Sequence, residues 1–170
     1  KKVVSCVVYA SNTKHADIRF EELKTPRAFE WNIYHHPKRI TCWDMDRVIC
    51  EDPPKGVDHP QEEYKDFLDT ARPVVLPAFP VHAIVTARLE IYRERTEKWL
   101  KRHGVKYHNL IMKPPGLQGA KNTPQYKADY YKKSIARLFI ESCPRQAPVS
   151  AELSGKPVFC VGNQKLYGDR

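Results

Sequence analysis

Two aspartates separated by one residue follow an apolar stretch near residue 40. Asp44 and Asp46 come directly after Ile40–Trp43, a run whose β-branched and aromatic residues predict a strand. Alternate side chains of an extended segment point the same way, so both carboxyl groups are expected to face one site. Such a pair could supply a nucleophile and a general acid, or hold a metal ion. Two solvated turn acids would explain the same pattern without any chemistry.

Three other polar residues occupy comparable positions. The stretch 82–87 predicts a strand that delivers Thr86, the stretch 138–142 predicts one that delivers Glu141, and Lys127 lies near the start of a predicted helix. Ligands of open parallel sheets bind at the carboxyl ends of the strands. Carboxylates there suit Mg²⁺, while a lysine and a hydroxyl can neutralise and orient phosphoryl oxygens. This set of groups therefore indicates phosphoryl chemistry.

Strand-like and helix-like stretches alternate along the rest of the chain. The patterns predict strands at 40–43, 82–87, 108–112, 138–142 and 157–161, and helices at 61–71, 89–104, 124–137 and 146–153. This alternation is typical of the α/β class and predicts a Rossmann-like three-layer α/β/α fold with a central parallel sheet and right-handed crossovers. Before it, a strand is expected at 3–9 and an irregular arm at 11–38.

The composition restricts the partners. A formal net charge of +9 favours a polyanion, either a phosphorylated small molecule or a nucleic acid, but the cations are spread along the chain, which disfavours specific nucleic-acid binding. The longest uncharged stretch, 73–86, contains three prolines and cannot be a membrane span. Five scattered cysteines without a CxxC pair indicate neither a disulfide framework nor a zinc site, and a cytoplasmic location is expected.

Three tyrosines occur at helical spacing in the predicted helix 124–137. Tyr126, Tyr130 and Tyr131 could in principle form a platform on which bases stack. At this spacing they are more readily explained as core and surface aromatics, and that interpretation is preferred from the sequence.

Four motifs in order resemble those of the haloacid dehalogenase (HAD) superfamily of phosphohydrolases. WDMDRVI at 43–49 is similar to the first motif, DxDx[TV] after a hydrophobic strand, and IVTAR at 84–88 is similar to the second. Lys127 fits the third, a lysine at a helix start, and LFIES at 138–142 fits the fourth, an acid at a strand end. The resemblance implies a HAD-like phosphatase domain at 39–170. The intervals between motifs are too short for a large cap domain, which implies an open site.

The resemblance also implies a role for each residue. Asp44 would be the nucleophile that forms an aspartyl phosphate, and Asp46 would be the general acid and base. Thr86 would bind the phosphoryl oxygens, and Lys127 would offset charge on the intermediate. Mg²⁺ would be held by Asp44, Glu141 and the carbonyl group of Asp46.

Two features depart from the family pattern. Arg47 stands where the family usually has glycine, and Ser142 and Gln146 stand where many members have a second acid. Arg47 and Arg88 are candidates for substrate binding, although a solvent-facing position is the preferred interpretation of Arg47. The departure at Ser142 would weaken the metal site.

The expected function is Mg²⁺-dependent hydrolysis of a phosphomonoester, such as a nucleotide or a phosphoribosyl compound. Two alternatives are a phosphatase that acts on nucleic-acid ends and a non-catalytic HAD-like module that binds a nucleotide or phosphate in a regulatory role. Salt dependence of binding would separate the first alternative, because phosphate contacts release counterions.

The N-terminal segment 1–38 resembles the last part of a purine-type phosphoribosyltransferase, carried by VVSCVVYASNTKHADIRFEELKTPRAFEWN at 3–32. By position, Asp17 would be a relic of a base-binding loop. The resemblance implies association with a phosphoribosyltransferase subunit, or self-association. A simple packing segment or docking strand is the preferred alternative.

Overall fold

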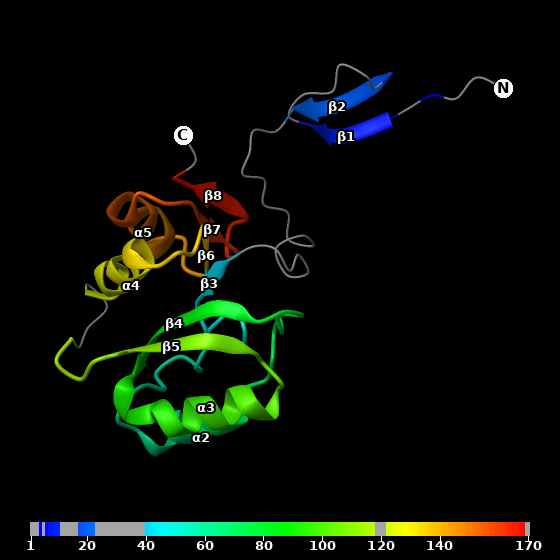
Figure 1. Ribbon diagram of the computed structural model, residues 1–170. Coiled ribbons are helices and arrows are strands. Elements are labelled where there is room, and N and C mark those ends of the chain that lie inside the picture. The colour runs from blue at the N-terminus through cyan, green and yellow to red at the C-terminus, as the bar shows by residue number, and fades with distance from the viewer. Residues whose placement is uncertain (1–3, 5, 11–16, 23–39, 118–121, 169–170) are drawn as a thin grey trace.

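The computed structural model describes residues 4, 6–10, 17–22, 40–117 and 122–168, and the statements below concern these residues. A small parallel sheet contains β1 (Cys6–Ala10) and β2 (Ile18–Glu22), and a six-stranded sheet forms the main body (Figure 1). In chain order, the elements of the main body are β3 (Thr41–Trp43), α2 (Glu62–Thr70), β4 (Val81–Leu89), η1 (Glu90–Tyr92), α3 (Arg93–Arg102), β5 (Tyr107–Lys113), α4 (Thr123–Lys133), β6 (Leu138–Glu141), α5 (Gln146–Ser154), β7 (Val158–Cys160) and β8 (Lys165–Tyr167).

The main sheet has the strand order β5-β4-β3-β6-β7-β8. The pairs from β5 to β7 are all parallel, which confirms the predicted α/β class and central parallel sheet. The last strand, β8, was not predicted and runs antiparallel to β7. It is a three-residue edge strand, exposed or half-buried along its length, so it lacks the apolar run that marks a buried parallel strand.

Helices cover both faces of this sheet. Side chains along each strand alternate between two cores, as the two-residue period of a strand requires. The first core contains Trp43, Ile84 and Ile140 together with Leu68 of α2 and Trp99 of α3; the second contains Cys42, Val85 and Phe139 together with Tyr131 of α4 and Ala147 of α5. The arrangement is that of a Rossmann-like three-layer fold (Figure 1).

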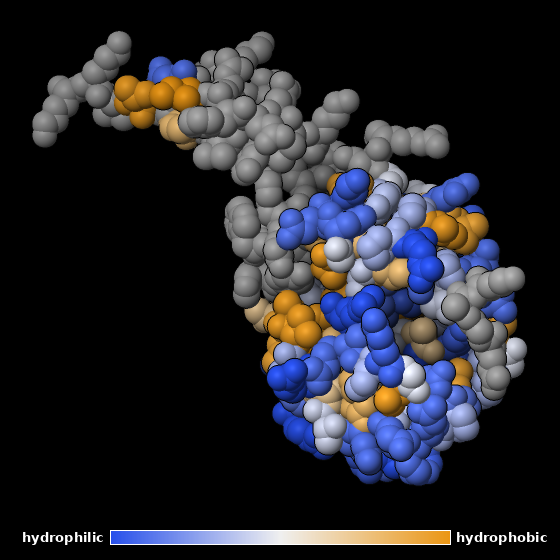
Figure 2. Space-filling view, turned by 180° about the vertical axis from the view of Figure 1, so that it is seen from behind, coloured by the Kyte–Doolittle hydropathy of each residue, from blue (hydrophilic) through white to orange (hydrophobic). Residues whose placement is uncertain are grey.

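The outer surface is mainly hydrophilic on the face that Figure 2 shows, where hydrophobic residues lie in small separate patches. Among the helices of the described ranges, none combines the length and the apolar composition needed to cross a membrane. The described residues between Asp46 and Thr86 form turns, α2 and the first part of β4, and those between Arg88 and Lys127 form the end of β4, η1, α3, β5 and the start of α4. Neither set builds a separate domain, and residues 118–121 lie outside the described part.

The order in which the chain adds strands to the sheet reverses between β3 and β6: β4 and β5 lie on one side of β3, and β6 and β7 lie on the other. From β3 the chain proceeds to β4 and β5 with α2 and α3 on one face, and it then returns to β6 and β7 with α4 and α5 on the other. A crevice for ligands forms at such a reversal, beyond the carboxyl ends of the strands. Trp43 is in register with Ile140, so Asp44 and Glu141 follow side by side at this point. The Asp44 amide group donates to the Ile140 carbonyl group over 2.9 Å.

Three sequence predictions need correction. The arm at 11–38 was expected to be irregular, but Ile18–Glu22 forms β2, and the arm's residues 11–16 and 23–38 lie outside the described part. The first strand is Cys6–Ala10 rather than 3–9. Helix α4 ends at Lys133 rather than at 137, because Ser134 turns to an extended conformation and Lys156 Nζ binds carbonyl groups of the segment that follows.

We predict that Gly162→Ala will disturb the loop after β6. A Cβ atom at this position would lie 2.3 Å from the backbone oxygen of Ser142, so the loop next to Glu141 must move. Overpacking of this kind costs about 1–3 kcal/mol, and we expect a loss of that size in the free energy of unfolding measured with urea. Gly116→Ala is the control, because a Cβ atom there meets nothing within 4 Å. Equal losses in the two variants would contradict the prediction.

Candidate active site

One lysine joins two acids at the point where the sheet reverses. Lys127 Nζ lies 2.8 Å from Asp44 Oδ2 and 2.8 Å from Glu141 Oε2. None of the three side chains is more than 8% exposed. The three formal charges sum to −1, so the cluster would gain from one more cation. We refer to these three residues as the acid–lysine cluster.

Backbone groups fix both acids. Asp44 extends β3 and accepts a hydrogen bond at Oδ1 from the amide group of Met45 over 2.8 Å. Glu141 ends β6 and accepts at Oε1 from the amide groups of Ser142 and Cys143, over 2.9 and 3.1 Å. Each carboxylate therefore has one oxygen held by the backbone and the other held by Lys127.

The two acids differ in how well their charge is stabilised. Burial raises the pKa of Asp44 well above its usual range, and the negative charge of Glu141 raises it further. Burial also opposes ionisation of Glu141, but the charge and hydrogen bonds of Lys127 and the amide group of Cys143 lower the pKa of Glu141 overall. Burial disfavours the charged form of Lys127, yet the two acids raise its pKa on balance. Asp44 is thus the acid whose ionisation an added cation would assist most.

A second buried ion pair lies beside this cluster. Arg88 has a fully buried side chain and donates from Nη2 and Nε to Asp46 Oδ1, over 2.6 and 3.1 Å. Arg88 Nη2 also lies 3.2 Å from Cys50 Sγ, and its guanidinium carbon lies 5.7 Å from the centre of the Phe67 ring. These contacts hold the Asp46 carboxylate in one orientation.

Thr86 and Arg88 lie two residues apart on β4, where the pairing of this strand is irregular. The register with β5 shifts between Val85 and Leu89, and the Arg88 amide group donates to Thr86 Oγ1 over 3.1 Å. The Thr86 side chain is buried. Arg88 was predicted to bind substrate; the structure places it on Asp46, and its Nη1 atom is buried without a hydrogen-bond partner among the described residues. Substrate contact by Arg88 stays a prediction.

Arg47 lies in a tight turn just after the two aspartates. Its φ angle is +65°, in the left-handed region where a side chain is strained and glycine is favoured. The side chain is exposed and forms an ion pair with Asp52 over 2.9 Å. The Arg47 side chain therefore binds Asp52, and its role in substrate binding stays a prediction.

The sequence reasoning overlooked Lys113. This lysine ends β5, is buried, and donates from Nζ to Thr123 Oγ1 over 2.9 Å. Burial lowers the pKa of Lys113, and the nearby charge of Lys127 lowers it further. The signal was available, because Lys113 follows the apolar run Leu110–Met112 in the way that Asp44 follows β3.

The side chains of the acid–lysine cluster could supply only some of the ligands of a Mg²⁺ ion. The described residues contain no group of three or more His, Cys, Asp or Glu side chains that could hold a metal ion. Mg²⁺, however, is usually bound by one or two carboxylates and completes its shell with water and phosphate oxygens. Asp44 and Glu141, with their net negative charge, are a suitable pair of ligands on this criterion.

No protein-family model matches the chain, and searches of curated proteins and of solved structures found no significant match. The interpretation of the site therefore depends on its motifs and its geometry.

We predict that the two partners of the Arg88–Asp46 pair differ in their importance for stability. Asp46→Asn leaves the wholly buried Arg88 charge uncompensated, which costs about 3–5 kcal/mol in typical buried pairs. Arg88→Met keeps much of the volume, and the Asp46 side chain, 20% exposed, can turn to water, so its loss should be smaller. Urea unfolding of both variants measures the difference. A larger loss for Arg88→Met would show that Arg88 stabilises mainly through packing.

We also predict that Asp44 destabilises the fold near neutral pH. The pKa of Asp44 in the folded state lies above its unfolded value near 3.8. At pH values between these two pKa values the folded state binds more protons than the unfolded state, so the free energy of unfolding falls as the pH rises through this range. Asp44→Asn should therefore raise the free energy of unfolding at pH 7 without divalent ions, and the gain should shrink toward pH 4. Urea midpoints at both pH values measure this; a variant less stable at pH 7 than the natural chain contradicts it.

Proposed function

We propose that the protein is a Mg²⁺-dependent phosphohydrolase that cleaves a phosphomonoester through an aspartyl phosphate on Asp44. The observation that carries the proposal is the acid–lysine cluster, in which Lys127 bonds both Asp44 and Glu141 at the reversal point of a parallel sheet. Burial raises the pKa of Asp44 well above its usual range, and acids with strongly shifted pKa values concentrate at functional sites.

The proposed reaction has two steps. A carboxylate oxygen of Asp44 attacks phosphorus, the bond to the leaving oxygen breaks, and Asp46, which must first take up a proton from solvent, gives that proton to the leaving oxygen. Water then attacks the phosphorus of the aspartyl phosphate while Asp46 takes a proton from it, which releases inorganic phosphate and restores Asp44. Both steps use the same two carboxyl groups, so the chain must hold them close together and in fixed orientations.

The surrounding residues support each step. Lys127 lies next to Asp44, where it would offset negative charge, and Arg88 would hold Asp46 in position. Thr86, at the same edge of the sheet, would bind a phosphoryl oxygen. A Mg²⁺ ion held by Asp44, Glu141 and the carbonyl group of Asp46 would neutralise charge on the phosphoryl group. The net charge of +9 favours a phosphorylated substrate, such as a nucleotide or a phosphoribosyl compound.

The test is hydrolysis of an aryl phosphate with and without Mg²⁺. We predict turnover that requires the metal ion and that falls at least about 10³-fold in Asp44→Asn, because this variant lacks the nucleophile. Asp66→Asn is the matched control, since Asp66 is an exposed acid on α2. Phosphate binding without turnover, in a folded natural chain, would favour a non-catalytic binding module. Full turnover by Asp44→Asn would refute the proposed nucleophile.

A further inference from the structure

A second buried lysine lies close to the acid–lysine cluster. Lys113 is the last residue of β5, is 4% exposed, and donates from Nζ to Thr123 Oγ1 over 2.9 Å. Thr123 begins α4 one turn before Lys127, and both of these side chains are buried. Residues four positions apart on a helix have Cβ atoms about 5–6 Å apart. The ammonium group of Lys113 is thus held about one helical turn from Lys127.

The sheet directs Lys113 to the face on which the acid–lysine cluster lies. Met112 points into the first core and Ile111 packs against the second, so the alternation of β5 places Lys113 on the side of the second core. Helix α4 covers that side, and Lys127 reaches both acids from the same helix. Lys113 and the cluster are therefore on one face of the sheet, beneath the first two turns of α4.

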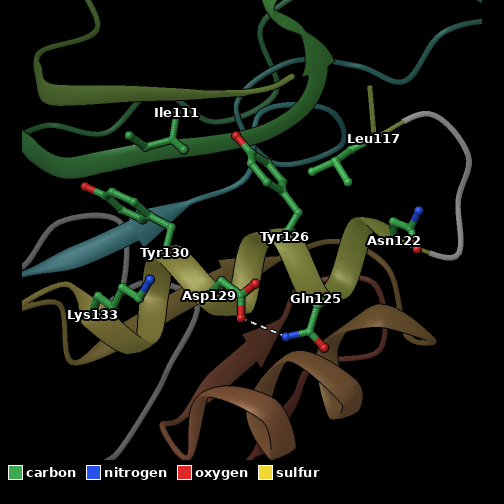
Figure 3. A pocket seen from close by; sticks show the side chains of 8 residues that line it. All are labelled: Ile111, Leu117, Asn122, Gln125, Tyr126, Asp129, Tyr130 and Lys133. Atoms are coloured by element: carbon green, nitrogen blue, oxygen red, sulfur yellow. Dashed lines mark hydrogen bonds between the residues drawn. The ribbon is translucent and has the colours of Figure 1, made fainter. Parts of the chain in front are cut away.

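The cavity beside α4 is a different place. A cavity of about 450 Å³ lies between α4 and β5, and Tyr126 and Tyr130 line it from the helix (Figure 3). Neither Lys113 nor Lys127 lines this cavity. Tyr131 is wholly buried in the second core, so the three tyrosines divide into one core residue and two cavity residues. The two lysines therefore belong to the surroundings of the acids rather than to the cavity.

The charges of this region favour an anion next to Lys113. Burial lowers the pKa of Lys113, and the charge of Lys127 lowers it further, so the two ammonium groups repel each other. An anion bound between them would relieve that repulsion. The acid–lysine cluster has a formal charge of −1, and Lys113 brings the total to zero. With a Mg²⁺ ion the region would carry two positive charges, which would balance a phosphate group of charge about −2.

From this arrangement we infer that Lys113 is a second phosphate-binding residue of the proposed active site and donates to an anionic phosphate oxygen of the substrate. The inference rests on the proposed function for the position of the phosphate. The long, flexible stem of a lysine allows Nζ to turn from Thr123 Oγ1 to a ligand. The oxygen belongs either to the phosphoryl group that is transferred or to a second phosphate next to it, since both present the same chemistry to an ammonium group.

The test is calorimetric titration of the full chain with inorganic phosphate and with pyrophosphate, at one fixed concentration of Mg²⁺. Lys113→Met keeps an unbranched side chain and removes its charge, so the affinity for at least one of the two anions should fall about tenfold or more. Lys132→Met, at an exposed position on α4, is the matched control and should bind both anions as the natural chain does. Equal losses for both anions assign Lys113 to the transferred phosphoryl group, and a loss confined to pyrophosphate assigns it to a second phosphate.

A second variant separates the charge of Lys113 from its contact with α4. Thr123→Val removes the hydroxyl group that Lys113 bonds but keeps the charge, so it should lose much less affinity than Lys113→Met. An equal loss in Thr123→Val shows that Lys113 only holds the helix, and this overturns the inference. Unchanged affinity of Lys113→Met for both anions also overturns it and leaves the proposed function standing. A folded natural chain that binds neither anion contradicts both the inference and the proposed function.

Discussion

A single buried ammonium group shared by two buried carboxylates is the interaction on which the site depends. Lys127 lies 2.8 Å from an oxygen of each acid, and none of the three groups could be buried alone without a large loss of hydration. Their meeting requires β3 and β6 to be neighbours and α4 to pack on the sheet beside them. The reversal of strand order between β3 and β6 therefore brings the two acids close enough to share one lysine.

The formal charges in this cluster do not cancel, because two negative charges face one positive charge. Backbone amide groups donate hydrogen bonds to one oxygen of each acid, and they stabilise the charged form of Glu141 more than that of Asp44. The pair formed by Arg88 and Asp46 is balanced by comparison, and it fixes the second aspartate at its edge. The charge of one aspartate is therefore only partly stabilised, whereas the other aspartate is held in place by Arg88, and the proposed two-step reaction makes use of this difference.

Much of this site could be predicted from the sequence, because a polar residue after an apolar run marks the carboxyl end of a strand. That reasoning found Asp44, Thr86 and Glu141. It could not find the contact between Arg88 and Asp46, because these residues are 42 positions apart in the sequence and meet only in the folded chain.

Other features depend on packing that no local pattern records. The cavity beside Tyr126 arises from the way α4 lies against β5, and the same spacing of tyrosines would occur in a helix without a cavity. Strand β8 is too short and too exposed to carry an apolar signal, and it forms because β7 offers it an edge. Lys113 is different, since the rule that located the acids applies to it equally.

The most direct test of the central claim is to quench a reaction in acid with a phosphomonoester labelled in its phosphoryl group, and then to map the label by peptide analysis. The account predicts a hydroxylamine-sensitive label on the peptide that contains Asp44, and no label in Asp44→Asn. A label on another residue in a chain that turns over would contradict the account.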